Sequence, residues 1–331
     1  KDTEYEDLIL RVEGRADGIF TQNEKICIDE IKGVYKNLEL LAEPVLVHRA
    51  QALCYAWIYL DDHGLEEIDV QMTYVHLDTE MIKRFRETMT REELESWYQR
   101  LLDSYHKWLS YQMKWREERN RSMEKLEFPF IYRKGQKEMV AGIYHAISRK
   151  EQIFIQAPTG VGKTMSAVFP AVRSIGEGKA ETLFYLTART ITRTVAQDAF
   201  EILRKNGLLF KTVTIIAKEK LCFCEKPECN PETCPYAKGH YDRINDAVYE
   251  LWTNEQSFDR ETILRQAEKW QVCPFEMSLD LSVWMDAVIC DYNYVFDPNV
   301  YLKRFFGENI SGKYLFLIDE AHNLVERGRE M

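Results

Sequence analysis

The stretch of residues 153–164 constrains the fold of this chain more than any other part of its sequence. In one-letter code it is IFIQAPTGVGKT, an apolar start followed by a loop with two glycines. The apolar, β-branched and aromatic start predicts a buried strand, and residues 165–175 have the apolar spacing of a helix. A strand, a glycine-bearing loop and a helix form the context of a phosphate-binding loop, for which the alternative is a chance turn. The strict pattern begins with Gly, whereas Ala157 occupies that place here.

The two glycines and the residues after them supply the chemistry of this loop. Gly160 and Gly162 can adopt backbone torsions closed to other residues, which lets successive N–H groups turn inward around a polyphosphate. The N-terminus of the following helix adds partial positive charge at the same point. Lys163 is expected to bind the β- and γ-phosphates, and the Thr164 hydroxyl is expected to ligate Mg²⁺. The predicted nucleotide contacts in the loop are Thr159, Gly160, Val161, Gly162, Lys163 and Thr164.

Short apolar runs separated by helical segments continue through the second half of the chain. This alternation predicts an α/β fold in which a parallel sheet is covered by helices on both faces. Ligands of such sheets gather at the carboxyl ends of the strands, so residues that directly follow a strand are candidates for a site. The predicted strands are 182–187, 212–216, 287–290 and 314–318.

The last of these strands is followed directly by Asp319-Glu320-Ala321-His322, a DEAH motif. At the carboxyl edge of the sheet, Asp319 can hold Mg²⁺, mainly through water, and Glu320 can polarise the water that attacks the nucleotide. An isolated DEAH tetrapeptide carries little weight, but this one follows an apolar strand and accompanies a phosphate loop. Together the two motifs predict hydrolysis of a nucleoside triphosphate.

Length and composition exclude several classes of protein. At 331 residues, 45% of them hydrophobic and 30% charged, the chain is expected to hold two globular domains, or one with large insertions. No apolar run reaches the length of a bilayer span and no signal peptide opens the sequence, so we expect a cytoplasmic protein without membrane contact. The net charge of −10 argues against a wholly basic surface for nucleic acid, but not against a local basic groove. The sequence starts with Lys and ends soon after the DEAH motif, as if cut at both ends.

Five of the eight cysteines fall in one long insertion, about 218–282, between two of the predicted strands. Without a secretory signal, such clustering indicates metal binding rather than disulfides. Thiolates that converge from irregular loops can hold a tetrahedral metal ion or an iron–sulfur cluster, and spacing alone does not separate the two. These cysteines are Cys222, Cys224, Cys229, Cys234 and Cys273.

The position of this insertion, between the phosphate loop and the DEAH motif, carries a family resemblance. The insertion is followed by Asp291-Tyr292-Asn293-Tyr294 and by Asp297-Pro298. In this order the motifs resemble the XPD/DinG family of superfamily 2 DNA helicases over roughly 131–331. The resemblance implies a RecA-like first motor lobe with a 4Fe–4S cluster, and a Zn²⁺ site is the alternative. The implied ligands are Cys222, Cys229, Cys234 and Cys273, and Cys224 is a fifth candidate that could replace Cys222 or Cys229.

The same resemblance implies how the lobe works and what it binds. Helicases of this family use ATP hydrolysis to move 5′→3′ along single-stranded DNA, and the cluster domain acts as a wedge. Gln136 and Arg133 are expected to contact the adenine, and Arg189 and Thr190 are expected to contact phosphates in the single-strand groove. Tyr292 either stacks on bases near the cluster or packs in the interior. Motor activity needs a second RecA-like lobe, which is expected beyond the last residue of this sequence.

The first part of the chain, 1–127, carries a different set of chemical groups. Two alternating runs around the polar turn 21–24 predict a β-hairpin. Asp17 ends the first run, and alternation places Glu30 and Lys32 on one face, where they can meet Asp17 across the hairpin. Two such carboxylates repel each other unless a divalent cation lies between them. A neighbouring lysine can then orient a water for attack on phosphate.

On the helix predicted to follow this hairpin, Gln51 and Tyr55 lie four residues apart and share a face. Together with Asp17, Glu30 and Lys32 they resemble the RecB-like PD-(D/E)XK nucleases. The resemblance implies that Asp17 and Glu30 hold Mg²⁺ or Mn²⁺, with Gln51 and Tyr55 in support. The alternatives are an ordinary hairpin and helix, or a nuclease fold without activity. Members of that family carry a further helix upstream, so we expect the N-terminus of this domain to be truncated.

The sequence therefore predicts a nuclease–helicase fusion, with a nuclease-like domain over 1–127 and a helicase lobe over 128–331. We expect an ATP-dependent helicase that acts on single-stranded or forked DNA in repair or recombination, with an attached metal-dependent nuclease. One alternative is a nucleotide- and DNA-binding scaffold whose nuclease half is inactive. Another is an RNA helicase, since a DEAH motif does not distinguish between nucleic acids.

Overall fold

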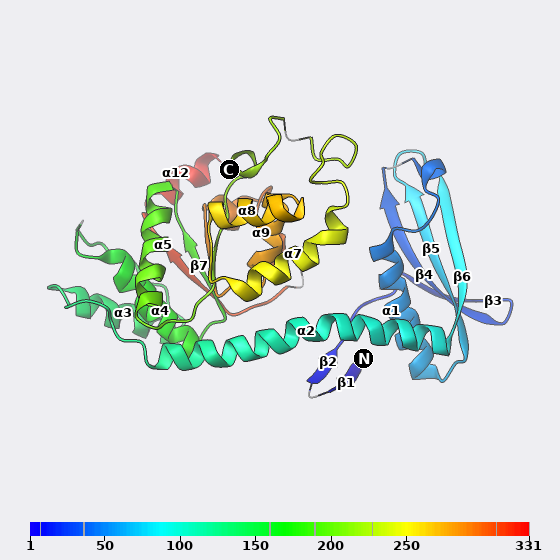
Figure 1. Ribbon diagram of the computed structural model, residues 1–331, viewed down its shortest axis with the longest axis horizontal. Helices are drawn as coiled ribbons and strands as arrows, with labels where there is room; N and C mark the ends of the chain where they lie inside the picture. The colour runs from blue at the N-terminus through cyan, green and yellow to red at the C-terminus, as the bar shows by residue number, and fades with distance from the viewer. Residues whose placement is uncertain are drawn as a thin grey trace. The chain divides into compact units, whose positions relative to one another are not determined.

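The computed structural model describes residues 1–331 except residues 7, 36, 159, 189, 227, 309 and 331, and it describes residues 190, 191 and 330 by their backbone alone. The chain folds as two compact units, Lys1–Leu109 and Ser110–Met331 (Figure 1). Among the described residues, no helix combines the length and the apolar character that crossing a membrane requires.

A mixed sheet with a helix on one face forms the centre of the first unit (Figure 1). Its strands β4 and β5 are parallel because a helix, α1, connects them, and the other pairs are antiparallel. α1 buries Ala52, Ala56 and Leu60 against this sheet. In sheet order the strands are β3 (Gly18–Gln22), β4 (Lys25–Val34), β5 (Glu67–His76) and β6 (Ile82–Thr90). The other elements are the hairpin β1 (Asp2–Tyr5) and β2 (Leu8–Arg11), η1 (Leu38–Leu40), α1 (Leu46–His63) and the first part of α2 (Arg91–Glu124).

Local sequence signals explain the hairpin of β3 and β4. Asn23 and Glu24 form its turn with φ of 53° and 65°, a left-handed pair that matches the twist of a two-residue hairpin. The ladder pairs Gly18 with Asp29, so Asp17 lies opposite Glu30 where the ladder ends. The predicted hairpin is confirmed, and a meeting of the Asp17 and Glu30 carboxylates stays a prediction.

The helix α2 begins in the first unit and ends in the second, so the division between the units lies within this helix. The sequence predicts a boundary near residue 128, whereas the division falls between Leu109 and Ser110. Side-chain contacts give the reason. Nε1 of Trp115 donates to Oδ2 of Asp286 at 3.1 Å, and Met123 is fully buried in the core of the second unit. The last part of α2 is therefore a structural element of the second unit.

A parallel sheet forms the centre of the second unit (Figure 1). Its strands follow the order β11-β7-β10-β8-β9, and α4 (Lys163–Gly176) and α5 (Thr190–Lys205) pack on it to form the main core. The strands are β7 (Thr182–Leu186), β8 (Thr212–Thr214), β9 (Ser257–Phe258), β10 (Ala287–Cys290) and β11 (Tyr314–Ile318), all paired in parallel. The predicted α/β fold with a parallel sheet is confirmed, and it fits a RecA-like helicase lobe.

The strand predicted at the start of the phosphate loop is wrong. Residues 151–158 have no regular structure, and Phe154 is 88% exposed between the exposed Ile153 and Ile155. β-branched and aromatic residues form a strand only where a neighbouring strand offers its edge. Among the described residues β11 pairs with β7 only, and the apolar run joins no ladder.

The predicted insertion, about 218–282, lies between β8 and β10 and supplies β9, which pairs with β8 at the edge of the sheet. Its first part, 222–239, has no helix or strand in the residues described there, and it carries four of the clustered cysteines. The other helices of the second unit are α3 (Gln136–Arg149), α6 (Lys218–Leu221), α7 (His240–Asn254), α8 (Arg260–Trp270), α9 (Pro274–Ser282), α10 (Asn293–Phe296), α11 (Lys303–Phe306) and α12 (Asn323–Glu330).

Candidate functional site

The phosphate loop has the backbone conformation that its glycines predict. Gly160 and Gly162 have φ of 85° and 78°, in the left-handed region that favours glycine. Gly162 precedes α4 as its N-cap, so Lys163 and Thr164 occupy the first turn of that helix. The helix therefore presents its N-terminal N–H groups at the loop, as a polyphosphate site requires. Thr159, another predicted contact, lies outside the described residues.

Gln136 and Arg133, which the sequence places near an adenine, hold the backbone of this loop. The buried Gln136 donates from Nε2 to the carbonyl of Val161 at 3.1 Å and accepts at Oε1 from the backbone N–H of Arg133 at 3.0 Å. The Arg133 guanidinium donates to the carbonyl of Gly160. A Cβ at Gly162 would lie 2.7 Å from Nε2 of Gln136, which is a second reason for glycine there. An adenine contact by Gln136 stays a prediction.

The DEAH motif lies beside the phosphate loop at the carboxyl end of β11. The N–H of Asp319 donates to the carbonyl of Leu186 at 2.9 Å, which continues the pairing with β7 by one residue. Glu320 follows with φ of 51°, and its Oε1 lies 3.6 Å from Nζ of Lys163. The structure therefore brings together the two motifs predicted to act on one nucleotide.

Tyr185 on β7 lies between the two groups expected to hold Mg²⁺. Its side chain is buried and interacts with both Thr164 and Asp319. Burial, followed by the negative charge of Asp319, raises the pKa of the Tyr185 phenol well above its usual range, so the phenol stays protonated. Sequence analysis missed this residue, because nothing distinguishes it from the apolar residues of its strand.

Tyr292 is a second residue whose role the sequence does not show. Its ring is fully buried, and its hydroxyl donates to the carbonyl of Asp319 and lies 3.2 Å from the carbonyl of Glu320. Of its two predicted roles, base stacking is therefore wrong and interior packing is confirmed. The signal that could have found its place is its position two residues after β10, at the same sheet edge as the DEAH motif.

The clustered cysteines are only partly brought together. Sγ of Cys224 lies 3.9 Å from Sγ of Cys234, and Cys224 also interacts with Cys222. Cys229 is exposed and interacts with Lys218, and the N–H of Cys273 lies 3.2 Å from Nδ1 of His240. Among the described residues, no three Cys, His, Asp or Glu side chains are arranged to hold a metal ion.

Two of the clustered cysteines are thiols rather than thiolates in this structure. Burial and the neighbouring Cys234 thiol raise the pKa of Cys224, and burial raises the pKa of Cys273, so both are thiols near neutral pH. Only thiolates bind a metal ion, so metal binding at these cysteines would release protons.

The two residues expected in the nucleic-acid groove cannot be placed, because Arg189 and the side chain of Thr190 lie outside the described part of the chain.

In the first unit four of the five predicted nuclease residues, Glu30, Lys32, Gln51 and Tyr55, form one connected chain of contacts. Nζ of Lys32 lies 2.5 Å from Oε1 of Glu30 and donates to Oε1 of Gln51 at 3.0 Å. Nε2 of Gln51 donates to the hydroxyl of Tyr55 at 3.1 Å. Oδ2 of Asp17 accepts from the N–H of Ile31 at 2.8 Å, at the position opposite Glu30. The spacing of these residues in the sequence therefore corresponds to a real cluster.

Glu30 has the property expected of a ligand to a cation. Its side chain is 1% exposed, and its Oε2 is buried without a hydrogen-bond partner among the described residues. A buried carboxylate oxygen without a partner is costly, and a divalent cation beside Asp17 would satisfy it. The donor set therefore fits Mg²⁺ or Mn²⁺, which prefer carboxylate oxygen.

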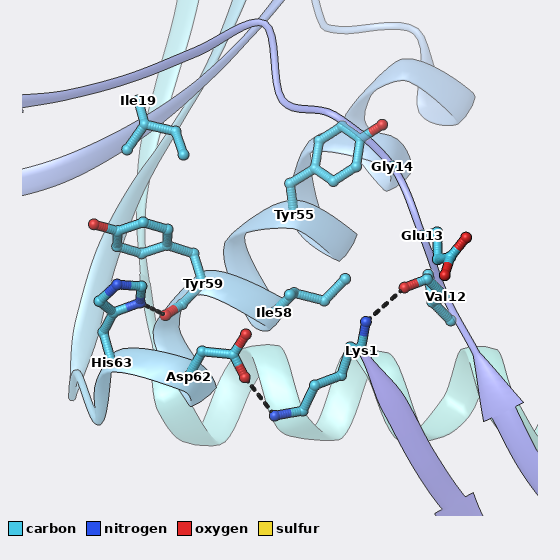
Figure 2. Close-up of a pocket in the computed structure, with 10 residues that line it drawn as sticks. All are labelled: Lys1, Val12, Glu13, Gly14, Ile19, Tyr55, Ile58, Tyr59, Asp62 and His63. Atoms are coloured by element: carbon cyan, nitrogen blue, oxygen red, sulfur yellow. Dashed lines mark hydrogen bonds and ion pairs between the residues drawn. The ribbon is translucent and has the colours of Figure 1, made fainter.

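A cavity of about 300 Å³ adjoins this cluster (Figure 2). Figure 2 shows Tyr55, Ile58 and Tyr59 of α1 along one side and Ile19 of β3 near them. Tyr55 therefore lines the cavity and contacts Gln51 as well. Gly14 leaves room for this ring, because a Cβ there would lie 2.5 Å from Cε1 of Tyr55.

Comparisons with known proteins point to helicases. Residues 133–222 match the DEAD/DEAH box helicase family, and residues 207–331 match the DEAD_2 family. The chain is 23% identical over 247 residues to the regulator of telomere elongation helicase 1 homolog of Caenorhabditis briggsae, covering 61% of this chain and 24% of that protein. It is 31% identical over 100 residues to the Fanconi anemia group J protein homolog of Gallus gallus, covering 30% of this chain and 8% of that protein.

Among solved structures the chain is similar to a truncated XPD, with 19% identity and a TM-score of 0.42 over 59% of this chain and 55% of that one. The chain spans about a quarter of the length of the telomere elongation helicase relative it matches. The two family matches together span residues 133–331, and the first of them is a family of DEAD/DEAH box helicases.

Proposed function

We propose that residues 133–331 are the first motor lobe of an ATP-dependent DNA helicase that moves 5′→3′ along single-stranded or forked DNA. The observation that carries the proposal is the pair Lys163 and Glu320, whose side chains face each other at 3.6 Å beside the carboxyl edge of a parallel sheet. Nucleotide hydrolysis needs such a pair, because the cation binds the terminal phosphates while the carboxylate acts on the attacking water. The helicase families that match this part of the chain support the link to nucleic acid.

The residues of this site have separate roles in the proposed reaction. Backbone N–H groups around Gly160 and Gly162 bind phosphate oxygens, and Lys163 places its charge on the β- and γ-phosphates. Glu320 polarises a water whose oxygen attacks the γ-phosphorus, and the bond from that phosphorus to the β–γ bridging oxygen breaks. Thr164 and Asp319 would hold Mg²⁺, which neutralises phosphate charge when bound.

Substitution of Lys163 tests the motor proposal. In the full-length protein, Lys163→Ala is expected to lower ATP affinity at least about tenfold and to abolish strand separation. Lys205→Ala, an exposed lysine at the end of α5, is the matched control and should leave both unchanged. Strand separation that persists without Lys163 rules out this motor. Forks with a single 5′ or 3′ tail give the direction of movement.

The alternatives predict different results with the same protein. Residues 1–331 alone should bind nucleotide and unwind nothing, because closure on ATP needs a second RecA-like lobe, which we propose to follow in the full-length chain. A scaffold would bind nucleotide and DNA without turnover. An RNA helicase would be stimulated in ATP hydrolysis by single-stranded RNA more than by single-stranded DNA, so competition between the two decides that point.

The cysteine insertion is proposed to hold a 4Fe–4S cluster through Cys222, Cys229, Cys234 and Cys273, with Cys224 able to replace Cys222 or Cys229. The separation of 3.9 Å between Cys224 and Cys234 favours a second candidate, because thiolates about 2.3 Å from a tetrahedral Zn²⁺ lie at nearly this distance from each other. Anaerobically purified protein that contains iron and absorbs near ~400 nm supports the cluster. Colourless protein that contains zinc supports the zinc site.

For the first unit we propose a metal-dependent nuclease that cuts phosphodiester bonds with Mg²⁺ or Mn²⁺. Asp17 and the unpaired Oε2 of Glu30 would hold the cation, and Lys32 is placed to orient a water toward the phosphorus. Gln51 fixes the Lys32 ammonium from α1. The support is the connected cluster and the buried carboxylate oxygen of Glu30, which has no hydrogen-bond partner among the described residues.

Substitution of Glu30 tests this second activity. Glu30→Gln keeps the volume of the side chain and removes its charge, so Mn²⁺-dependent DNA cutting should fall at least about a hundredfold. Glu39→Gln, at an exposed position of η1, is the matched control. Cutting that is unchanged in Glu30→Gln contradicts the nuclease and leaves the inactive platform as the better description of this unit.

A further inference from the structure

The backbone at the DEAH motif has a conformation that needs external support. Glu320 has φ of 51°, in the left-handed region where residues other than Gly, Asn and Asp are uncommon. Such a conformation persists only where the surroundings hold it, and it often serves a site. Glu320 directly follows Asp319, the last residue that pairs with β7, and its Oε1 lies 3.6 Å from Nζ of Lys163.

The support comes from Tyr292. Its hydroxyl proton is shared between the carbonyls of Asp319 and Glu320, which are the two peptide oxygens of the turn. Asn323 adds two contacts to the second of them, because its N–H and its Nδ2 each donate to the carbonyl of Glu320 at 3.0 Å. The turn is therefore held by three donors from two separate segments of the chain.

Tyr292 is held in position by burial of its ring and by backbone hydrogen bonds. Its ring is fully buried, and its carbonyl accepts from the N–H groups of Val295 and Phe296 at 3.0 Å. It lies two residues after the end of β10, whereas the motif follows β11, and β7 lies between these strands in the sheet. The hydroxyl therefore reaches across one strand to the motif, along the edge where the strands end.

The segment around Tyr292 also contacts the helix α5. Oδ2 of the neighbouring Asp291 lies 3.7 Å from Nη2 of Arg193, and the N–H of Asn293 donates to Oδ1 of Asp291 at 3.1 Å. This helix begins at Thr190, a residue expected in the single-strand groove. The segment that supports the DEAH turn therefore contacts the helix whose first residue is expected in the single-strand groove.

We propose that Tyr292 is a positioning residue for ATP hydrolysis, which holds the turn at Asp319 and Glu320 so that the Glu320 carboxylate faces the phosphates bound by Lys163. The proposal rests on the nucleotide hydrolysis proposed above for this lobe. Its hydroxyl acts on the carbonyls of Asp319 and Glu320, so its loss should change the reaction and not the binding. This separates its role from that of the phosphate loop.

The test is Tyr292→Phe in the full-length protein, because this change keeps the buried ring and removes only the hydroxyl. We expect kcat for DNA-stimulated ATP hydrolysis to fall about tenfold or more, since a small displacement of a reacting group is costly in rate. KM for ATP should stay within about twofold of wild type, because the phosphate loop is unchanged. A loss of folded protein alone would lower the apparent kcat and the midpoint of thermal unfolding together.

Tyr314→Phe is the matched control, since Tyr314 lies at the opposite end of β11 with its ring 5.5 Å from that of Phe184. It should leave kcat unchanged. If Tyr292→Phe does not fold, Asn323→Ala replaces it, because the partly buried Asn323 supports the same carbonyl and should lower kcat at constant KM.

A wild-type kcat in Tyr292→Phe, or a raised KM at constant kcat, overturns the positioning role. Wild-type protein that hydrolyses no ATP, or hydrolysis that survives Lys163→Ala, overturns the motor proposal instead. The two failures are therefore distinguishable in one set of measurements.

Discussion

Nζ of Lys163 lies 3.6 Å from Oε1 of Glu320, and this contact joins the phosphate loop to the DEAH motif. The two side chains are 34% and 42% exposed, so water screens their attraction. An exposed pair of this kind contributes at most about 1 kcal/mol to folding. The pair therefore matters for chemistry rather than for stability, and the two effects can be separated by mutation.

Glu320→Gln is predicted to separate them. The free energy of unfolding should change by less than about 1 kcal/mol, because the pair is exposed and the side-chain volume is kept. ATP hydrolysis should fall at least about a hundredfold, because a neutral amide polarises water poorly. Denaturant titration and steady-state kinetics on the same preparation measure both quantities. A variant that is destabilised as much as it is inactivated would contradict this separation.

The nucleotide site was predictable because its signals are local. The positive φ of Gly160 and Gly162 follows from the spacing of glycines before a helix, and the DEAH residues follow an apolar strand. Tyr292 could not be assigned, because its partners lie on a different strand and only sheet order brings them together. The exposed Phe154 shows the converse, since composition favours a strand there and the fold supplies no partner.

Asp286 is a buried carboxylate, and its substitution is predicted to lower the stability of the protein much more than substitution of Glu320 does. It is 3% exposed and accepts from Nη1 of Arg119, from Nε1 of Trp115 and from the N–H of Lys211. Asp286→Ala should lower the free energy of unfolding by about 3–5 kcal/mol, because it leaves a buried guanidinium without its partner. Thermal or urea unfolding measures the loss.

Glu117→Gln is the control for this prediction, since Glu117 forms an exposed ion pair with Arg121 on the same helix, α2. It should cost less than about 1 kcal/mol. Equal losses for the buried and the exposed pair would mean that Asp286 does not anchor α2 in the second unit.

The cation proposed for the first unit should stabilise the protein measurably. At a Mn²⁺ concentration of about ten times its dissociation constant, binding to the folded state alone adds about 1.4 kcal/mol. Glu30→Gln should lose this gain, and addition of EDTA to wild type should remove it. Thermal unfolding with and without Mn²⁺ measures the effect. An equal Mn²⁺-induced shift in both proteins would place the cation elsewhere.

The nuclease-like cluster was predictable from alternation along β4 and helical spacing along α1. Glu30 and Lys32 share a face two residues apart, and Gln51 and Tyr55 share a face four residues apart. That one oxygen of Glu30 has no partner in the described part of the chain was not predictable, because it depends on every group that packs around it. The end of the first unit was missed for a related reason: α2 continues without a break, and only long-range contacts such as Trp115 with Asp286 show where it changes partners.

Lys211 is a buried cation that should make stability depend on pH. Its side chain is 1% exposed, and its Nζ donates to the carbonyls of Trp252 at 2.5 Å and Glu255 at 2.6 Å. Nζ also lies 4.2 Å from the centre of the Trp115 ring. Burial lowers its pKa from 10.5 to about 8 against the opposing effect of Asp286. A neutral amine still has two N–H donors, one for each carbonyl.

Between pH 8 and 10.5 the unfolded chain therefore binds more protons at Lys211 than the folded protein does, so raising the pH favours the folded state through this group. Below pH 8 both states are charged and the full cost of burying the charge is present. The free energy of unfolding of wild type, relative to Lys211→Met, should rise by about 1.6 kcal/mol between pH 8 and pH 9.5. Urea titrations of both proteins at these pH values measure the difference in free energy of unfolding. The contributions of the other titrating groups cancel between the two proteins, and the constant cost of the substitution cancels between the two pH values. A difference that stays flat or falls with pH would show that Lys211 keeps an ordinary pKa in the folded protein.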